Sequence, residues 1–129
     1  MTPYALLLQA CGLSQREAAD LHDVRLDTVK SWAAGRREAP PAAIGELRAL
    51  WWRIRSTANK AIEAIRARRA PGAVDDIEIP YPETDEQARA LGLPCVGAWR
   101  AVTAIVIAKV ETPIRLVARA RTGGKHDDQ

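Results

Sequence analysis

The sequence predicts a mainly α-helical protein with a small two-stranded β element. Helix-capping residues bracket three short segments within the first 40 residues, and apolar residues spaced alternately three and four apart run from position 44 to 65. Strand-like segments occur at 77–81 and 114–118, on either side of further helical sequence. Helices are therefore expected to build the molecule, with the two strands added to them.

The chain is expected to open with a helix. Thr2 is a favourable N-cap, and Pro3 suits the first helical position because its missing N–H would have no intrahelical partner there. The helix should continue to about Cys11 and end at Gly12, a residue that commonly closes helices.

A capping box marks the start of a second short helix. The Ser14 side chain can accept a hydrogen bond from the backbone N–H of Glu17, while the Glu17 side chain can accept one from Ser14. This helix should run from Gln15 to about Leu21. Asp23 then falls in a turn where a positive φ is expected, a conformation that Asp and Asn tolerate better than most side chains.

A third helix is expected from about Leu26 to Ala34, ending at Gly35. The small core of this helix pair should consist of Ala19, Val24, Val29 and Trp32. The residues expected to face outward are Arg25, Leu26, Asp27, Lys30 and Ser31. Two short helices joined by a tight turn are typical of a DNA-reading helix-turn-helix, and the alternative is an ordinary αα-hairpin with no DNA role.

Residues 13–40 resemble the Cro/repressor-like (XRE-type) helix-turn-helix family, and the resemblance covers roughly residues 1 to 50. The matching positions are Leu13, Ser14, Gln15, Glu17, Ala19, Asp23, Val24, Trp32 and Gly35. The chain departs from the family pattern at His22, where a buried Leu is usual, so that Leu21 could fill the core only if the helix rotates slightly. Ala33 and Ala34 replace a common polar pair, which removes possible phosphate contacts.

The resemblance implies which residues meet DNA. In this family the start of the recognition helix reaches base edges in the major groove, and the flanking helix start and loop hold phosphates. The implied base-reading residues are Arg25, Leu26, Asp27 and Ser31. The implied phosphate-binding residues are Gln15, Thr28, Lys30, Arg36 and Arg37.

The chemistry of the side chains agrees with most of these roles. Arg25 can donate two hydrogen bonds to guanine, Leu26 can contact a thymine methyl group, and Ser31 can bond to either kind of base. Asp27 can accept a hydrogen bond from cytosine, but it is equally well explained as a first-turn acid that stabilises the helix N-terminus. Both interpretations of Asp27 stay open.

Charge is unevenly distributed along the 129 residues, which carry a formal net charge of +3. Residues 1–70 contain twelve Lys and Arg against seven Asp and Glu, a net +5, whereas residues 71–129 contain seven against nine, a net −2. Clustered cations neutralise phosphates and release counterions, so a basic N-terminal half agrees with DNA binding. Solvated Arg residues on a long helix are the alternative explanation beyond position 48.

Several functional classes find no support in the sequence. The N-terminus lacks the pattern of a signal peptide, and no uncharged stretch approaches the roughly 18 residues that span a bilayer, so a cytoplasmic protein without membrane contact is expected. Cys11 and Cys95 are far apart without His at metal-ligand spacing, which predicts reduced thiols and no metal. His22 and His126 belong to no catalytic constellation. We therefore expect neither an enzyme nor a cofactor, and no small-molecule ligand is evident.

A long amphipathic helix is expected between Pro41 and Ala70. Its apolar positions alternate three and four apart over about three heptads, more than a small N-terminal core can cover. They are Ile44, Leu47, Trp51, Ile54, Ala58, Ala61 or Ile62, and Ile65. Trp51 and Trp52 are adjacent, so only one of them can face this seam, and the other is a candidate for a dimer surface.

The second half of the chain mixes strands and helices. Residues 77–81 alternate as a short strand, which Pro80 restricts to an edge or an end. Thr84 and Gln87 form a capping box for a short helix that Gly92 closes. An apolar helix from Ala98 to about Val110 is expected to be buried nearly all round. Residues 114–118 can pair with 77–81, and 121–129 are expected to be disordered.

This order of elements, with Gly97, Trp99 and Arg100 introducing the last helix, is similar to the autorepressors associated with anti-CRISPR operons. The resemblance implies a helix-turn-helix domain at 1–50, a connecting helix at 51–70, a dimerisation domain at 71–120 and a tail at 121–129. It also implies a homodimer that represses its own operon at an inverted repeat. The residues expected to support dimerisation are Trp51, Trp52, Trp99, Val102, Ile105 and Val106.

Two functions from different classes follow. The first is a transcriptional repressor that binds a palindromic operator on double-stranded DNA as a homodimer. The second is an antitoxin-type interaction protein whose C-terminal half holds a second polypeptide. An enzyme is the least favoured class, because the acids at 75–76 and 85–86 are typical of solvated loop and helix-cap charges.

Overall fold

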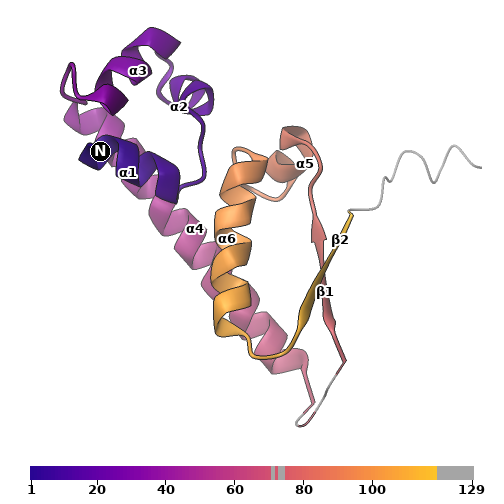
Figure 1. Ribbon diagram of the computed structural model, residues 1–129. Coiled ribbons are helices and arrows are strands. Elements are labelled where there is room, and N and C mark those ends of the chain that lie inside the picture. The colour runs from indigo at the N-terminus through magenta and orange to yellow at the C-terminus, as the bar shows by residue number, and fades with distance from the viewer. Residues whose placement is uncertain (71, 73–74, 119–129) are drawn as a thin grey trace, which may run out of the picture.

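The computed structural model describes residues 1–70, 72 and 75–118, and the predicted tail at 121–129 lies outside them. Figure 1 shows the short N-terminal helices at one end of the long helix, and the later helices and strands along its other half. The described elements are α1 (Pro3–Ala10), α2 (Gln15–His22), α3 (Leu26–Ala34), α4 (Pro41–Arg68), β1 (Ile77–Tyr81), α5 (Asp85–Ala90), α6 (Val96–Lys109) and β2 (Ile114–Ala118). The prediction of a mainly helical protein with a two-stranded sheet is confirmed.

The signals that start the N-terminal helices act as predicted. The Thr2 side chain accepts a hydrogen bond from the backbone N–H of Ala5 at 3.0 Å. Ser14 and Glu17 form both hydrogen bonds of the capping box, at 3.1 and 2.8 Å. These local interactions satisfy backbone N–H groups that the first turn of a helix leaves without intrahelical partners.

The buried face of α4 differs in part from the predicted seam. Leu47, Ile54 and Ala58 are buried as predicted, but Leu50 is buried in place of the half-exposed Trp51. A helix with 3.6 residues per turn drifts relative to a 3.5-residue repeat, so one linear pattern does not follow a single contact face over 28 residues. The helix ends at Arg68, before the predicted stop at 71–72.

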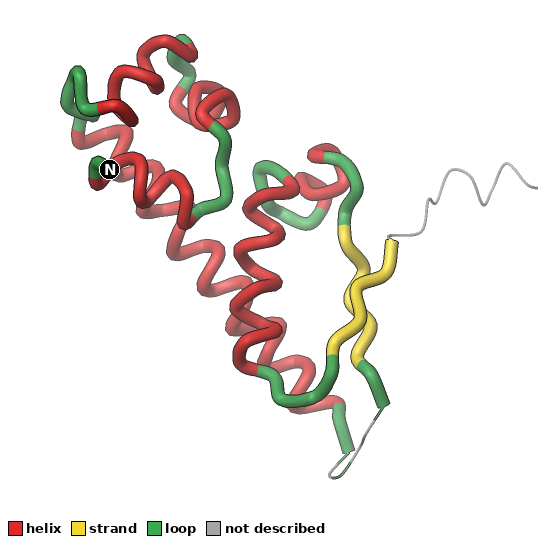
Figure 2. The backbone as a smooth tube through the Cα atoms, in the orientation of Figure 1, coloured by secondary structure: helices red, strands yellow, loops and turns green. Residues whose placement is uncertain are grey.

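The packing of α6 corrects two details of the prediction. The helix begins at Val96, two residues before the predicted Ala98. It lies beside the second half of α4 (Figure 2), and the residues of α6 that this packing buries include Val102 and Val106. Ile107 lies 47% exposed. The expectation that this helix is buried nearly all round is therefore wrong for the face that carries Ile107.

The two strands pair in parallel, in the register Ile77↔Ile114 through Tyr81↔Ala118. Ile77, Ile79 and Tyr81 pack against the hydrophobic core, whereas Glu78 and Pro80 are exposed. This alternation confirms a strand with one buried face. Arg115 of β2 forms an ion pair with Glu78 on the exposed face.

The helix α5 precedes α6 and begins at a modified capping box. The Thr84 hydroxyl accepts from the backbone N–H of Gln87 at 3.1 Å, as predicted. The Gln87 side chain accepts from the N–H of Glu83 at 2.7 Å, instead of from the N–H of Thr84. Gly92 follows the helix with φ +87°, in agreement with its predicted role as the closing residue.

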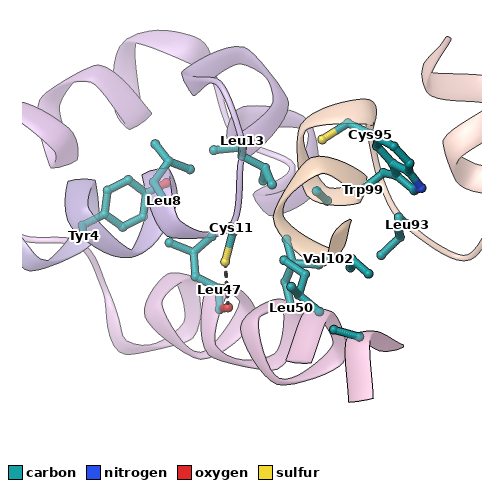
Figure 3. Close-up of a cluster of buried hydrophobic side chains, with 14 of the residues drawn as sticks. Tyr4, Leu8, Cys11, Leu13, Leu47, Leu50, Leu93, Cys95, Trp99 and Val102 are labelled. Carbon is teal, nitrogen blue, oxygen red and sulfur yellow. Dashed lines mark hydrogen bonds between the residues drawn. The ribbon is translucent and has the colours of Figure 1, made fainter. Parts of the chain in front are cut away.

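One buried cluster connects the N-terminal helices with α4 and α6, from Tyr4 to Val110. Figure 3 shows Leu50 of α4 between residues of α1 and residues of α6. At the junction the backbones touch, because a Cβ atom built on Gly12 would lie 2.1 Å from the carbonyl oxygen of Gly97. The predicted domain division at residue 50 falls inside α4 and inside this continuous core.

Candidate nucleic-acid interface

The turn between α2 and α3 fixes how the two helices cross. Asp23 has φ 56° and ψ 49°, the left-handed conformation predicted for it. The N–H of Val24 bonds to the carbonyl of Ala19 at 3.0 Å, and the N–H of Asp23 bonds to that of Asp20 at 3.2 Å. This pair of hydrogen bonds is the Schellman motif, which ends α2 and redirects the chain into α3.

The end of α3 is held by a second Schellman motif and by a contact with α1. Gly35 has φ 83°, and the N–H of Arg36 bonds to the carbonyl of Ser31 at 3.0 Å. The Thr2 hydroxyl donates to the carbonyl of Ala33 at 3.2 Å. Thr2 therefore caps α1 and also ties its start to the end of α3, which fixes the position of α3 from both ends.

A cluster of aromatic and polar side chains joins α1, α2, α3 and α4. His22 is hydrogen-bonded through Nδ1 to Glu46 at 2.7 Å and through Nε2 to the Tyr4 hydroxyl at 3.0 Å. Trp32 packs edge-on against the rings of Tyr4 and His22, with centroids 5.6 and 5.7 Å apart. His22 itself occupies the core position, with a side chain 2% exposed, so Leu21 need not replace it.

The partners of His22 were missed by sequence reasoning. A histidine at a buried position signals that a polar partner is needed, because a buried polar group without a hydrogen bond is costly. Tyr4 lies 18 residues before His22 and Glu46 lies 24 residues after it. Nothing in the local pattern selects these two residues, since tertiary packing alone brings them together.

Alkaline pH is expected to weaken the fold through Tyr4. Burial, followed by the nearby Glu46 carboxylate, raises the pKa of Tyr4 from 10.0 to about 12. The folded state favours the neutral phenol, so this contribution to stability is fully present below pH 10 and is lost as the pH rises toward 12. We expect a loss of roughly 1 to 3 kcal/mol from this group.

The variant Tyr4→Phe isolates the effect, because it removes the ionisable hydroxyl and keeps the ring. Urea denaturation of both proteins at pH 8, 10.5 and 11.5 measures the free energy of unfolding. At pH 8 the variant is expected to be less stable by about 1 kcal/mol, because it cannot form the hydrogen bond to His22. The gap should narrow or reverse at pH 11.5, and a gap independent of pH contradicts this assignment.

The predicted base-reading residues lie at the start of α3 and one turn further along it. Arg25 is the residue that precedes the helix, and Asp27 lies in its first turn; both are exposed. Leu26 and Ser31 are half-buried, so part of each side chain is occupied by packing. Arg25 has the conformation of an N-cap without a side-chain cap bond. Its guanidinium is therefore not occupied in holding the helix.

The predicted phosphate-binding residues surround this surface in sequence and structure. Gln15 begins α2, Lys30 is exposed on α3, and the exposed Arg36 and Arg37 follow the end of α3. Thr28 is half-buried in α3. Within residues 1–70, 72 and 75–118, the side chains of these five residues make no hydrogen bond or ion pair, so nothing in that part of the chain competes for them.

The basic excess of the N-terminal half lies elsewhere than expected. Residues 1–50 contain six Lys and Arg and six Asp and Glu, whereas residues 51–70 contain six Lys and Arg and one Glu. The net +5 therefore belongs to residues 51–70, most of which lie in α4 where it leads away from α2 and α3 (Figure 1). The basic excess therefore does not support DNA binding at the α2–α3 surface. The electrostatic attraction of DNA to this surface depends instead on the positions of individual cations around α3.

Half of the residues predicted for dimerisation, Trp99, Val102 and Val106, are buried within the single chain. Val102 and Val106 are 6% and 2% exposed, and Trp99 is 9% exposed with its ring 6.3 Å from that of Tyr81. We reassign these three residues to the intrachain core, because contacts with α4 and β1 already cover them. Ile105 is half-buried and packs against the same core.

Trp51 and Trp52 differ as the sequence predicts. Trp51 is half-buried, with the Arg55 guanidinium carbon 5.6 Å from its ring centre. Trp52 is 64% exposed on the opposite side of the helix from the core. Among the predicted dimerisation residues, Trp52 is thus the one whose side chain is largely available to a partner.

Both cysteines are free and buried. The Cys11 thiol donates to the Leu47 carbonyl at 3.6 Å, and burial raises its pKa to about 11 (Figure 3). Burial and the neighbouring Glu17 carboxylate raise the pKa of Cys95. Neutral, buried thiols react slowly, so both cysteines have structural roles at the junction of the N- and C-terminal segments.

The described part of the chain holds no helix both long and apolar enough to cross a membrane. Its His, Cys, Asp and Glu residues form no group of three that could hold a metal ion. Comparison with protein-family models finds no match for the chain, and comparison with curated proteins finds none either.

Proposed function

We propose that the protein is a sequence-specific DNA-binding repressor that reads the major groove with α3. The observation that carries this proposal is the α2–turn–α3 geometry. A left-handed Asp23 joins two short helices, Thr2 and Trp32 fix α3 against α1, and the start of α3 projects Arg25 and Asp27 into solvent. A rigid short helix with polar residues at its exposed start is the form that enters the major groove of DNA.

The residues divide by task in this proposal. Arg25, Leu26, Asp27 and Ser31 meet base edges, which specify the sequence. Gln15, Thr28, Lys30, Arg36 and Arg37 meet phosphates, which hold the protein in register. Because residues 1–50 carry no net charge, affinity for random DNA should be weak, and base contacts should supply a large share of the binding free energy.

A single unit of this size offers few base contacts, so the proposal includes a homodimer. Two-fold symmetry in the protein requires a palindromic operator, with half-site centres about one helical turn, roughly 10 base pairs, or a multiple of it apart. The resemblance of the element order to autorepressors supports an operator in front of the protein's own gene.

Selection of binding sites from a random duplex pool tests this proposal. We expect enrichment of an inverted repeat and a footprint that covers two half-sites on the same face of the duplex. A variant that carries Arg25→Ala and Ser31→Ala should fail to enrich the same sequence. Recovery of unrelated sequences, or a footprint over one asymmetric half-site, contradicts the proposal.

A further inference from the structure

Strand β2 has an edge that faces away from β1. The N–H of Ile77 in β1 donates to the carbonyl of Pro113 at 2.9 Å, which fixes which backbone groups face the neighbouring strand. In a parallel pair, alternate residues of each strand face the partner strand. With Ile77 in register with Ile114, the N–H and C=O groups of Ile114, Leu116 and Ala118 therefore point outward. This edge can accept another strand.

The outer edge of β1 is blocked by proline. Because the N–H of Ile77 faces β2, the backbone groups of Glu78 and Pro80 face the opposite side. Pro80 has no N–H to donate, so a strand added on this side would lack the hydrogen bond at one of the two outward positions of β1. Of the two outer edges of this sheet, only that of β2 carries an uninterrupted row of donors and acceptors over the described strands.

Leu116 adds an uncovered apolar side chain to this edge. It is in register with Ile79, and in-register residues of a parallel pair point to the same face of the sheet. Ile79 packs against the core on that face, yet Leu116 is 43% exposed. The core of one chain thus covers Ile114 at the start of β2 but leaves Leu116 largely open, although a two-stranded sheet needs cover to be stable.

We propose that β2 is the dimerisation surface and that its occupant is the β2 strand of a second copy of this chain, paired antiparallel across a two-fold axis. The result is a four-stranded sheet with the two β2 strands at its centre. A strand edge is self-complementary under two-fold rotation, and an exposed apolar edge is a template for such pairing. The inference deepens the homodimer of the proposed function by naming the surface that forms it.

Charge also permits this pairing. Arg115 is the charged residue of β2, and it is engaged by Glu78 on the outer face of the sheet. In a register centred on Leu116, that residue lies opposite the partner's Leu116, and Arg115 lies opposite the partner's Val117. Like charges therefore do not meet, and two apolar side chains cover one another at the axis.

Matched proline substitutions on the two edges test the surface. Leu116→Pro removes an outward N–H of β2, and Glu78→Pro makes the same change on the outer edge of β1, so neither removes a backbone hydrogen bond of the β1–β2 ladder. Glu78→Pro also removes the ion pair with Arg115, which leaves Arg115 opposite the partner's Val117, an uncharged residue. Sedimentation velocity without DNA measures the dimer dissociation constant. We expect a dimeric wild type, an increase of at least tenfold for Leu116→Pro and a wild-type value for Glu78→Pro.

Circular dichroism shows whether Leu116→Pro folds, and a second variant tests the surface if it does not. Leu116→Lys keeps the backbone N–H but places two ammonium groups opposite each other at the axis, and it should also dissociate the dimer. A monomeric wild type, an unchanged dimer in a folded Leu116 variant, or dissociation by Glu78→Pro overturns the proposal. The sedimentation experiment contains no DNA, so a failure of the operator selection would not change its result. A failure of the sedimentation experiment would likewise leave the operator selection unaffected.

Discussion

The variant Arg25→Ala is expected to lower the affinity for the preferred operator by about 1 to 3 kcal/mol for each bidentate pairing with guanine that it removes. A symmetric dimer carries two copies of Arg25, so roughly 2 to 6 kcal/mol is expected in total. Arg25 is exposed at the start of α3 and caps nothing with its side chain, so its replacement should leave the fold intact. Binding to random DNA should change much less, because base contacts contribute little there.

Arg36→Ala and Arg37→Ala are the matched controls, since they also remove one exposed cation each. Each variant lacks one phosphate-binding cation, so its affinity should fall by a similar factor for operator and for scrambled duplexes. The slope of log affinity against log salt concentration should fall in magnitude by about one unit per phosphate no longer neutralised. Titrations on both duplexes at several salt concentrations separate the two classes of residue. If Arg25→Ala left the ratio of specific to random affinity unchanged while Arg36→Ala abolished it, the assignment of α3 as the reading helix would be wrong.

The local part of the fold was predictable because its determinants are close in sequence. Ser14 and Glu17 are three residues apart and form the capping box that starts α2. Asp23 and Gly35 adopt the positive φ angles that their residue types suggested. Each signal acts within one turn of backbone, so neither the rest of the chain nor its packing was needed to interpret it.

Contacts between distant segments were not predictable in the same way. His22 forms hydrogen bonds to residues 18 and 24 positions away. The sequence shows that a histidine is unusual at this position, but it does not identify the partners. Leu50 is buried because α1 and α6 approach α4 from different directions, which no single repeat along the helix encodes. Three-dimensional packing determines which of these residues are buried or hydrogen-bonded, and a linear sequence pattern predicts this only in part.

The distribution of charge gives a second example. A count over residues 1–70 suggested a basic DNA-binding half, but the excess cations belong to residues 51–70, mostly in α4. Residues such as Arg66 use their side chains within the chain, since its guanidinium donates to the carbonyl of Lys109 at 3.1 Å. Net charge over a window therefore says less about the site than the position of each exposed cation around α3.

Trp99, Val102 and Val106 were assigned to a dimer surface for a related reason. Apolar side chains on the predicted last helix had to be covered, and the sequence does not say whether the cover comes from the same chain or from a partner. The structure covers Val102 and Val106 with the chain's own α4. The apolar surface left over is smaller and includes Trp52, Ile107 and Leu116.

Gly97→Ala is expected to destabilise the protein strongly. A Cβ atom at this position in α6 would lie 1.8 Å from the carbonyl oxygen of Gly12. The obstructing atoms belong to backbone between α1 and α2, so they cannot rotate away as a flexible side chain could. Relief requires separation of α6 from the N-terminal helices across the continuous core, and we expect a decrease in stability of about 3 kcal/mol.

Gly45→Ala is the matched control, because it makes the same change in the helix α4. Nothing lies within 4 Å of a Cβ atom built there, and the residue is exposed. Alanine favours helix over glycine by about 0.8 to 1 kcal/mol, so this variant should be slightly more stable than the wild type. The two substitutions are thus expected to change stability in opposite directions, which intrinsic helix propensity alone cannot produce.

Thermal and urea denaturation of the wild type and both variants measure the effect. A decrease of about 3 kcal/mol should lower the melting temperature by roughly 10 °C for a chain of this size, and Gly45→Ala should raise it by a few degrees. If Gly97→Ala were as stable as the wild type, the close approach of Gly12 and Gly97 would be absent in solution. The direction of α3 relative to the proposed two-fold axis would then no longer be fixed by this contact.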